Sequence, residues 1–406
     1  MTGFFAQSEL SEVRTSSVLP KCGSCGLHKK CDSPKMKVFG QGKKSVLFIK
    51  TCPNADEDDQ GRYWAEDANT RFLCSALNDI GVDIKEDCWT TSAAICYGDS
   101  PTAYESCQPN LMTTIKELDP LVIVPMGKFA IASLISHLWK NPAGITDRWV
   151  GQKIPCLDPN AWVCPVEGIS HLLRENRGSK WHGRHPDEVG SVLFKEQLAS
   201  LFKKTRRPWK SVPDYRKKII AKMSAESAAA FIRKELKRGL TAAAFDYECN
   251  MLKPDDDEAQ IYCASICFDG KRTIAFPWQG KVIKAMREFV SHPVPKIAAN
   301  LMMEERWTYK VLGVPTNNWL FDTCIGGHVQ DNRSGISSLD FQAFIQLGQP
   351  VYSQAVKPFL KAKGAKKKNL IHRVPIRDLL IYNGLDSLLT YKVAMRQRKA
   401  LGFKPL

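Results

Sequence analysis

The sequence predicts an α/β protein with two domains. Its 406 residues exceed the size of one ordinary domain, so two is the natural expectation. Short apolar runs alternate with helical patterns through the first half, which is typical of a mostly parallel sheet with helices on both faces. The second half shows three strand signals in a row before helices follow. We expect a first domain over residues 1–205, a basic linker over 206–222 and a second domain over 223–406.

In the first domain, Ser45–Lys50 (SVLFIK) is expected to be a buried strand because it is a short apolar run. A helix over Ala68–Ile80 follows, since its apolar residues recur at helical spacing and Gly81 is typical of a helix end. The same alternation continues with a strand over Cys88–Ile95, a helix over Glu105–Leu118, a strand over Leu121–Pro125, and helices over Lys128–Trp139 and Glu188–Lys203.

The second domain is expected to open with a helix over Ala225–Arg238, capped by Ser224 and ended by Gly239. Strand signals then cover Thr241–Glu248, Gln260–Phe268, Arg272–Trp278 and Lys296–Asn300, and a long helix covers Val374–Leu401. Between the domains, Lys203–Lys218 is dense in cations and contains two prolines. We interpret it as an exposed tether that either contacts phosphate or is simply solvated.

The composition indicates a soluble protein with an affinity for polyanions. Apolar residues make up 44% of the chain, and no apolar run reaches the ~18 residues that a membrane span needs. The formal net charge of +16 favours nucleic acid, because cations that bind phosphates release counterions. A basic protein without such a partner is the alternative. The chain does not open with a signal peptide, so its fourteen cysteines argue against a disulfide scaffold.

Four carboxylates and one phenol lie in three distant segments of the second domain. Asp246 and Glu248 are two residues apart on a strand and therefore point to the same face. Like charges held side by side repel unless a cation lies between them, so this pair suggests a divalent metal. Glu304 follows a strand end by one helical turn, and Tyr382 and Asp386 share one face of the last helix. A lone Asp-x-Glu is usually ordinary surface, and the other segments make the pattern specific.

In this order the five residues resemble the DEDD exonuclease superfamily in its tyrosine-containing subclass. The resemblance is closest to the 3′–5′ proofreading domain of family A DNA polymerases in its phage form. Asp322-Thr323 and Ser337-Ser338-Leu339 are further matches, and the likeness covers Ala225–Leu401. It implies a ribonuclease H-like fold with a mixed sheet. One departure is Glu304, which stands where many members carry Asp, although phage relatives often carry Glu.

The resemblance implies hydrolysis of DNA with two Mg²⁺ or Mn²⁺ ions, one activating water and the other stabilising the leaving 3′ oxygen. Such hard cations prefer oxygen ligands. By analogy, Asp246 would bridge both ions. Glu248 and Asp386 would complete the ligands of one ion, and Glu304 would support the other. Tyr382 would orient the attacking water.

The first domain opens with CGSCGLHKKC, in which Cys22 and Cys25 form a Cys-x-x-Cys pair and Cys31 follows closely. In a reducing compartment this pattern indicates a metal or iron–sulfur site. Over Lys21–Phe202 the chain resembles family 4 of the uracil-DNA glycosylases, the iron–sulfur type. The matches are Phe39-Gly40-Gln41-Gly42, Gly61-Arg62-Tyr63-Trp64, Cys96, Cys107 and Gly127-Lys128-Phe129-Ala130. The resemblance implies a three-layer α/β/α fold and a structural 4Fe–4S cluster on Cys22, Cys25, Cys96 and Cys107, with Cys31 as a substitute or a neighbour.

The residues that would carry glycosylase chemistry are replaced. Thr51 stands where the family has a carboxylate, and Ser92 stands where it has the amide that reads the uracil edge. Gly168 occupies the position of the histidine that stabilises charge on the uracil. Glu57 and the base-stacking aromatic Trp64 are retained. The domain is therefore predicted to bind DNA or a partner without cleaving the glycosidic bond.

Together the two resemblances predict a phage-type replication protein, a detached proofreading exonuclease with a degenerate glycosylase module. Its substrate would be single-stranded DNA or a frayed 3′ end. Its partner would be a separate family A DNA polymerase chain, since no polymerase domain follows. The basic linker and the lysine run Lys361–Lys368 would hold phosphates, although that run is equally a mobile loop. We expect no membrane partner and a cytoplasmic location, in the host cytoplasm if a phage encodes the protein.

Two alternatives stay open. In the first, the protein is an active uracil repair enzyme, with His185 in His185-Pro186-Asp187 as a displaced counterpart of the missing histidine, although its surroundings do not match the motif. In the second, it is a non-catalytic replisome subunit in which both sites are inactive. The intact Asp246, Glu248, Asp386 and Tyr382 argue against this second alternative.

Overall fold

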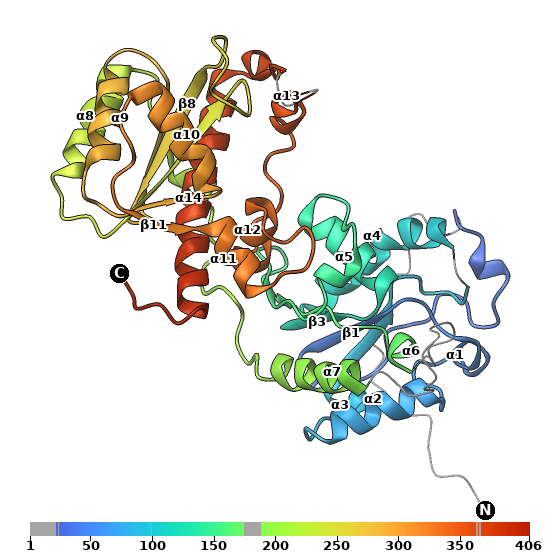
Figure 1. Cartoon of the computed structure of the whole chain (residues 1–406). Coiled ribbons are helices and arrows are strands. Elements are labelled where there is room, and N and C mark those ends of the chain that lie inside the picture. Colours follow the sequence, from blue (N-terminus) through green and yellow to red (C-terminus); the bar gives the residue numbers. More distant parts are fainter. Residues whose placement is uncertain (1–21, 23, 99, 174–187, 363, 365–366) are drawn as a thin grey trace, which may run out of the picture. The chain divides into compact units, whose positions relative to one another are not determined.

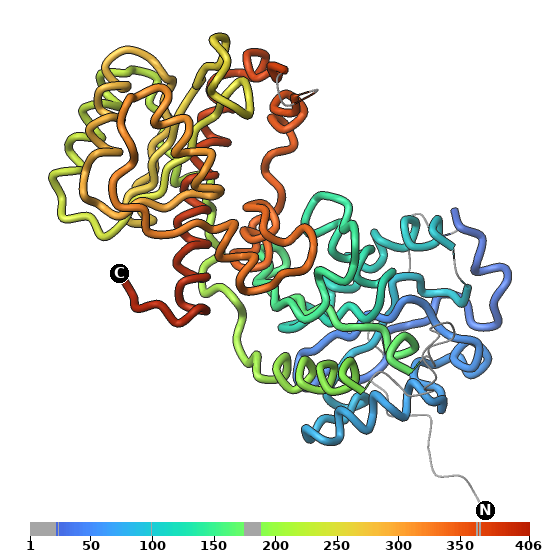
Figure 2. Tube along the Cα trace, viewed as in Figure 1, coloured from blue at the N-terminus to red at the C-terminus, as the bar shows by residue number. Residues whose placement is uncertain are grey.

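The computed structural model describes residues 22, 24–98, 100–173, 188–362, 364 and 367–406. The chain divides into two compact units, of which unit 1 ends at Val212 and unit 2 begins at Pro213. Each unit has a sheet of its own, as the ribbon shows (Figure 1), and the Cα trace follows the chain through both units (Figure 2). None of the helices formed by the described residues is both long enough and apolar enough to span a membrane.

Unit 1 contains a five-stranded, mostly parallel sheet in the order β2-β1-β3-β5-β4. The central strand β1 (Val46–Lys50) pairs in parallel with β2 (Cys88–Ser92) and with β3 (Val122–Pro125). β5 (Trp162–Val163) lies parallel to β3, and β4 (Ile154–Pro155) runs antiparallel at the edge. The mostly parallel sheet expected from the strand–helix alternation is confirmed.

Helices lie on both faces of this sheet (Figure 1). The helices α2, α6 and α7 pack against Val46 and Phe48 on one face, while α4 and α5 lie on the other. The bounds are α1 (Ala55–Gln60), α2 (Ala68–Asn78), α3 (Ile84–Asp87), α4 (Pro101–Leu118), α5 (Lys128–Trp139), α6 (Ile169–Leu172) and α7 (Glu188–Leu201), with single 3₁₀ turns η1 (Leu27–Lys29) and η2 (Thr146–Arg148). Helix α4 begins earlier than expected, because Pro101 at its first position lacks only an N–H that a helix start leaves unpaired.

Residues 206–222, expected as a basic linker, belong partly to each unit. Arg207 and Trp209 donate hydrogen bonds to main-chain carbonyls of unit 1, so the first part is packed on that unit. The second part forms the 3₁₀ turn η3 (Arg216–Lys218) and the strand β6 (Ile219–Ala221), which pairs with β9 in unit 2. A strand of three residues is too short to give a recognisable periodic pattern, which is why the sequence did not indicate it.

Unit 2 contains a six-stranded mixed sheet in the order β11-β10-β7-β8-β9-β6. Strands β7 (Ala243–Cys249), β8 (Ile261–Phe268) and β9 (Arg272–Pro277) form an antiparallel meander. β10 (Lys296–Ala298) lies parallel to β7, and β11 (Trp319–Asp322) lies parallel to β10. The expected mixed sheet is confirmed. It contains two further strands, β11 and β6, that the sequence did not predict.

The alternation of side chains along β7 separates the core from the acidic residues. Phe245 and Tyr247 pack into a core with α8 and α9, so Asp246 and Glu248 point to the opposite face, where α14 lies. Helix α14 approaches the sheet closely at Gly384, where a Cβ would lie 2.4 Å from Cγ2 of Ile219. The helices are α8 (Ala225–Leu236), α9 (Lys281–Ser291), α10 (Leu301–Leu312), α11 (Thr323–Gln330), α12 (Leu339–Leu347), α13 (Lys357–Leu360) and α14 (Ile376–Ala400), with the 3₁₀ turn η4 (Ile371–Arg373).

Candidate metal centre

Three of the predicted carboxylates meet between β7 and α14. One ligand oxygen from each of Asp246, Glu248 and Asp386 lies within 4.8 Å of the other two. Asp246 pairs across the sheet with Ser265 of β8, whose hydroxyl donates a 2.7 Å hydrogen bond to the main-chain carbonyl of Asn383. This bond fixes α14 against the sheet at the level of the acidic cluster, because Asn383 lies three residues before Asp386 on α14.

Glu304 is the fourth predicted carboxylate, and it reaches the cluster from α10. Asp322 accepts hydrogen bonds from the main-chain N–H groups of Leu301 (2.8 Å) and Cys324 (2.8 Å), so it caps the starts of α10 and α11 together. This places Glu304 one turn into α10, where it is 3% exposed. Its Oε2 is buried without a hydrogen-bond partner among the described residues. A buried carboxylate oxygen without a hydrogen-bond partner is available as a ligand of a metal ion.

Burial and mutual repulsion hold protons on the cluster. Burial raises the pKa of Asp246 to about 7, although a hydrogen bond from Asn383 opposes the shift. Burial and then the charge of Asp246 raise the pKa values of Glu248, Glu304 and Asp386 well above their ordinary range. Cations at this site would therefore favour the ionised form of all four groups, and their hard oxygen donors fit Mg²⁺ or Mn²⁺.

Two residues that the sequence did not single out hold these carboxylates. The side-chain amide of Asn383 donates a 2.6 Å hydrogen bond to Oδ2 of Asp246. The phenol of Tyr352 donates to Oδ1 of Asp386, and its ring lies 5.8 Å from that of Tyr382. Asn383 follows Tyr382 directly in the sequence, so its position beside the motif could have indicated it. Tyr352 lies in an irregular segment between α12 and α13, where no periodicity could have indicated it.

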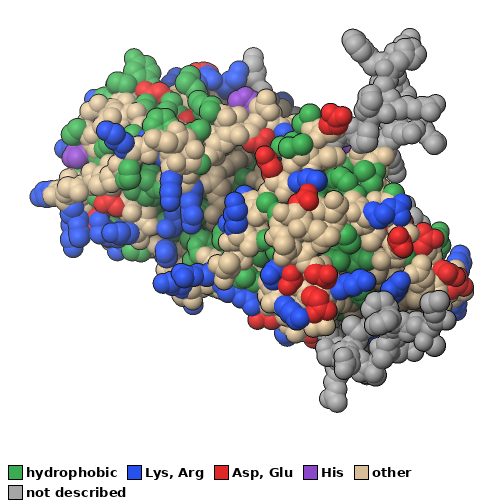
Figure 3. All heavy atoms as spheres, turned by 90° about the horizontal axis from the view of Figure 1, so that it is seen from below, with side chains coloured by type: hydrophobic (Ala, Val, Ile, Leu, Met, Phe, Trp, Pro, Cys, Tyr) green, Lys and Arg blue, Asp and Glu red, His purple; other side chains and the backbone are tan. Residues whose placement is uncertain are grey.

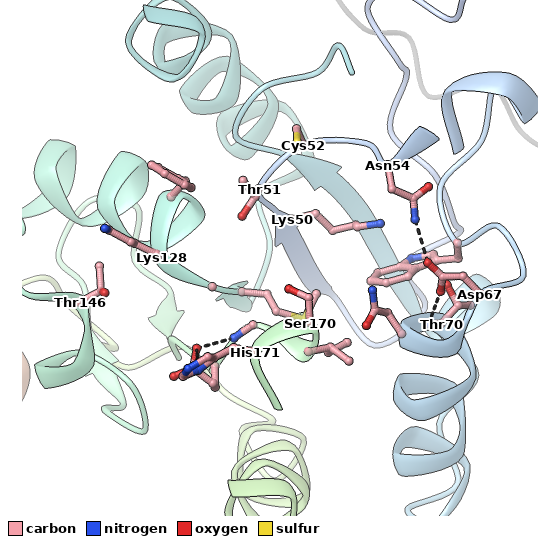
Figure 4. Close-up of a pocket in the computed structure, with 18 of the residues that line it drawn as sticks. Lys50, Thr51, Cys52, Asn54, Asp67, Thr70, Lys128, Thr146, Ser170 and His171 are labelled. Carbon is pink, nitrogen blue, oxygen red and sulfur yellow. Dashed lines mark hydrogen bonds and ion pairs between the residues drawn. The ribbon is translucent and has the colours of Figure 1, made fainter. Parts of the chain in front are cut away.

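Unit 1 has a pocket of about 620 Å³ beside the ends of β1 and β3. Lys50 at the end of β1 and Thr51 directly after it line the pocket, as does Lys128 at the start of α5 (Figure 4). Of the five residues predicted for a degenerate glycosylase pocket, Thr51, Trp64 and Gly168 line it. The remaining two, Glu57 and Ser92, are buried outside its lining.

Glu57 and Trp64 are fully engaged in structural contacts. Glu57 is completely buried and accepts hydrogen bonds from the main-chain N–H groups of Asn54 (2.9 Å) and Trp64 (2.7 Å). It also forms an ion pair with Lys50, whose ammonium lies 4.5 Å from the centroid of the Trp64 ring. Trp64 is 6% exposed and donates through Nε1 to the hydroxyl of Thr90 (2.8 Å). The aromatic residue expected to stack on a base is thus contacted by a lysine of this chain.

Gly168 and Ser92, which replace reactive residues of the family, make close contacts with their neighbours. A Cβ on Gly168 would lie 3.3 Å from the Cα of Gly127, which is tighter than most contacts of this kind. The hydroxyl of Ser92 lies 2.7 Å from the phenol of Tyr63 and donates to the carbonyl of Ala94 (2.8 Å). His185, the candidate for a displaced histidine, lies outside the described residues.

The five cysteines of the predicted cluster region come together. The thiol of Cys31 is hydrogen-bonded with that of Cys96, and Cys107 is close enough to Cys22 and Cys25 for their charges to raise its pKa further after burial. The N–H of Lys35 donates to Sγ of Cys96 at 3.3 Å. Within the described part of the chain, no three cysteine sulfurs lie within 4.8 Å of one another.

A family comparison matches part of unit 1. Residues 37–186 match the model of the uracil DNA glycosylase superfamily. The type-4 uracil-DNA glycosylase of Archaeoglobus fulgidus is 29% identical over 123 residues, which are 29% of this chain. The chain spans 60% of the length of that curated relative.

Among solved structures, the catalytic core of RRP6 from Trypanosoma brucei is 17% identical and covers 45% of this chain and 46% of its own, with a TM-score of 0.34. NrnC of Brucella melitensis bound to pGG is 15% identical and covers 40% of this chain and 74% of its own, with a TM-score of 0.33. The POL domain of Pol1 from M. smegmatis in complex with DNA primer-template and dNTP is 12% identical, covers 45% of this chain and 27% of its own, and has a TM-score of 0.32.

Proposed function

We propose that unit 2 is a metal-dependent 3′–5′ exodeoxyribonuclease. The observation that carries the proposal is the convergence of the half-buried Asp246 with the buried Glu248 and Asp386. Glu304 lies beside them with an unpaired oxygen. Two Mg²⁺ or Mn²⁺ ions, when bound, would supply an activated water and a charge partner for the leaving oxygen. Asp246, Glu248, Asp386 and Glu304 would hold these ions.

The remaining residues of the site would position the reacting groups. Tyr382 shares a hydrogen bond with Asp386 and lies on the same face of α14, so its phenol would orient the attacking water. Asn383 fixes Oδ2 of Asp246, the carboxylate that would contact both ions.

For unit 1 we propose a role in binding, either of DNA or of a protein partner, without cleavage of the glycosidic bond. Its support is the replacement of the reactive groups by Thr51, Ser92 and Gly168 and the contact of Lys50 with Trp64. Cys22, Cys25, Cys96 and Cys107 would hold a 4Fe–4S cluster that fixes the N-terminal segment, with Cys31 as a neighbour of Cys96.

For the whole chain we propose a proofreading role beside a separate family A-type DNA polymerase in the cytoplasm. The substrate would be single-stranded DNA or a mispaired 3′ end, because only an unpaired terminus can reach a buried acidic site. The support for this role is the resemblance of the five catalytic positions to the proofreading domains of those polymerases, together with the net charge of +16.

The test is degradation of DNA labelled at its 5′ end, with Mg²⁺ or with EDTA. We expect a ladder of products shortened from the 3′ end that depends on the metal, faster from single strands and mispaired ends than from paired ends. Asp246→Ala should abolish it, whereas Asp378→Ala, which removes an exposed carboxylate of α14, should not. Undiminished degradation by Asp246→Ala, or none by the wild type with Mn²⁺, would overturn the proposal. An RNA strand of the same sequence tests the preference for DNA.

A further inference from the structure

Unit 2 carries a cluster of cations around a buried tyrosine, separate from the acidic site. Nζ of Lys218 lies 6.0 Å and Nζ of Lys392 lies 5.9 Å from the centroid of the Tyr215 ring. Arg396 is close enough to the Tyr215 phenol to oppose the rise in its pKa caused by burial. Tyr215 is 4% exposed, so the ring is a fixed support for side chains that come from η3 and α14. We call Lys218, Lys392 and Arg396 the cation cluster.

Within the described ranges, the cation cluster is without an acidic partner. Among the ion pairs of the described residues, none involves any of its three members, although Asp214 pairs with the neighbouring Lys217 at 3.4 Å. Burial and then the charges of Lys218 and Arg396 lower the pKa of Lys392, which shows that the like charges interact. The fold therefore holds three cations together at a cost in repulsion that an anion would relieve.

The cluster and the acidic site lie on the same helix but at different ends of the sheet. Lys392 is close to Cys267 of β8, which pairs with Ala244, two residues before Asp246 on β7. Asp386, by contrast, meets β7 at its carboxyl-terminal end. Along α14, Lys392 and Arg396 follow Asp386 by about 9 Å and about 15 Å at the rise of an α-helix. Phosphates of one polynucleotide strand can span this separation.

We propose that the cation cluster binds phosphates of the DNA strand whose 3′ end is being degraded, beyond the nucleotide at the acidic site. The inference rests on the proposed exonuclease function and deepens it. Lys218 and Arg396 are exposed, Lys392 is half-buried, and Lys and Arg side chains gather on the face of unit 2 that Figure 3 shows. A strand is favoured over an acidic protein because the acidic site would consume a polymer of regularly spaced phosphates, and a second contact would retain it between cycles.

The consequence is processive degradation that depends on strand length. A strand long enough to reach both sites remains bound after each nucleotide is released, whereas a trinucleotide contacts the acidic site alone. Three phosphate contacts contribute about −2 to the slope of log affinity against log salt for a single strand. Loss of the cluster should therefore make binding weaker and less sensitive to salt, and it should leave the hydrolytic step itself unchanged.

The experiment uses the full chain with Lys218→Gln, Lys392→Gln and Arg396→Gln combined. Binding of a long single-stranded oligodeoxynucleotide is measured in EDTA over a range of salt concentrations. We expect an affinity at least about tenfold lower at low salt and a slope smaller by about 2. The triple variant should hydrolyse the p-nitrophenyl ester of thymidine 5′-phosphate at the rate of the wild type. Its degradation of a long strand should change from processive to distributive.

The matched control removes the same charge from another exposed surface, with Lys281→Gln, Lys284→Gln and Arg287→Gln on α9. Equal losses in both triple variants, or no loss in the first, would overturn the proposal. So would loss of binding to a polyglutamate peptide with DNA binding unchanged, since the partner would then be an acidic protein.

Because Lys392 is half-buried, the double variant Lys218→Gln with Arg396→Gln repeats the measurement with exposed residues alone, and it should show about two thirds of the change in slope. If the wild type hydrolyses neither the ester nor DNA, the exonuclease proposal fails. The binding measured in EDTA still decides whether the cation cluster holds phosphate.

Discussion

The phenol of Tyr352 donates a hydrogen bond to Oδ1 of Asp386, and this bond joins an irregular segment to the acidic site on α14. The bond stabilises the ionised carboxylate, opposing burial and the charge of Asp246, which raise the pKa of Asp386. The bond therefore orients Asp386 and offsets part of the rise in its pKa. Tyr352 acts as a positioning residue through Asp386.

Replacing Tyr352 by Phe should weaken metal binding and leave the fold intact. A hydrogen bond to a charged group contributes ~1.5–3 kcal/mol, which corresponds to about tenfold or more in affinity. We expect the Mn²⁺ concentration for half-maximal activity to rise by that factor, with the rate at saturating Mn²⁺ largely recovered. A rate that stays low at saturating Mn²⁺ would instead place Tyr352 in contact with the reacting groups.

Asn383→Leu should have a larger effect, because it leaves Asp246 without its 2.6 Å donor inside the protein. Partners that orient metal ligands typically contribute about 10–100-fold to affinity or activity. The rate of 3′ degradation should fall by this amount and should not be restored by excess Mn²⁺. Asn383→Asp, of equal size but with an added carboxylate, should be at least as impaired; full activity in either variant would contradict the assigned role.

The metal-free protein should lose stability as the pH rises. Burial raises the folded pKa of Asp246 from its ordinary value of 3.8 to about 7. A raised acidic pKa means that the folded state binds more protons than the unfolded state between these values. Stability is therefore fully present below the ordinary value and is lost as pH passes through about 7, by ~1.4 kcal/mol per pH unit for each proton.

Thermal unfolding in EDTA at pH 5 and pH 8, for the wild type and Asp246→Asn, measures this effect. Relative to the wild type, the variant should be more stable at pH 8 than at pH 5, because it has no charge to bury. Mg²⁺ should stabilise the wild type at pH 8 and have little effect on the variant. A stability difference that does not change with pH would show that Asp246 is ionised in the metal-free protein.

Purified protein should release no uracil from uracil-containing DNA, and Gly168→His should not restore the activity. A Cβ at Gly168 meets the Cα of Gly127 at 3.3 Å, so a histidine there would have to displace the main chain. Lys50 also contacts the ring of Trp64. An active family 4 glycosylase assayed in parallel is the positive control, and robust excision by the wild type would refute the assignment of unit 1 as a binding module.

Cys107→Ala should remove iron and the visible absorption of the protein, while 3′ degradation by unit 2 persists. Because binding of a structural metal group contributes directly to folding, we expect the unfolding temperature of unit 1 to fall by about 10 °C. Cys74→Ala, a half-buried cysteine on α2 remote from the five, should keep its iron. Unchanged iron content in Cys107→Ala would show that this thiol is not a ligand.

The local spacing of residues determined much of the candidate site. Asp246 and Glu248 share a face because side chains alternate along a strand, and Tyr382 and Asp386 share a face because a helix repeats every 3.6 residues. Both relations join residues that are close in the sequence, so the sequence alone predicts them. The α/β class and the strands and helices with strong periodicity follow from the same local patterns.

Only the tertiary structure decided which distant groups meet. The contact of β7 with α14, the bonds of Tyr352 and Asn383 to the two aspartates, and the convergence of Lys218 and Lys392 on Tyr215 all depend on how elements pack. No periodicity encodes such contacts, because they join segments whose separation in sequence is unrelated to their separation in space. The short strand β6 was missed for a related reason, since its sheet partner and not its own three residues makes it a strand.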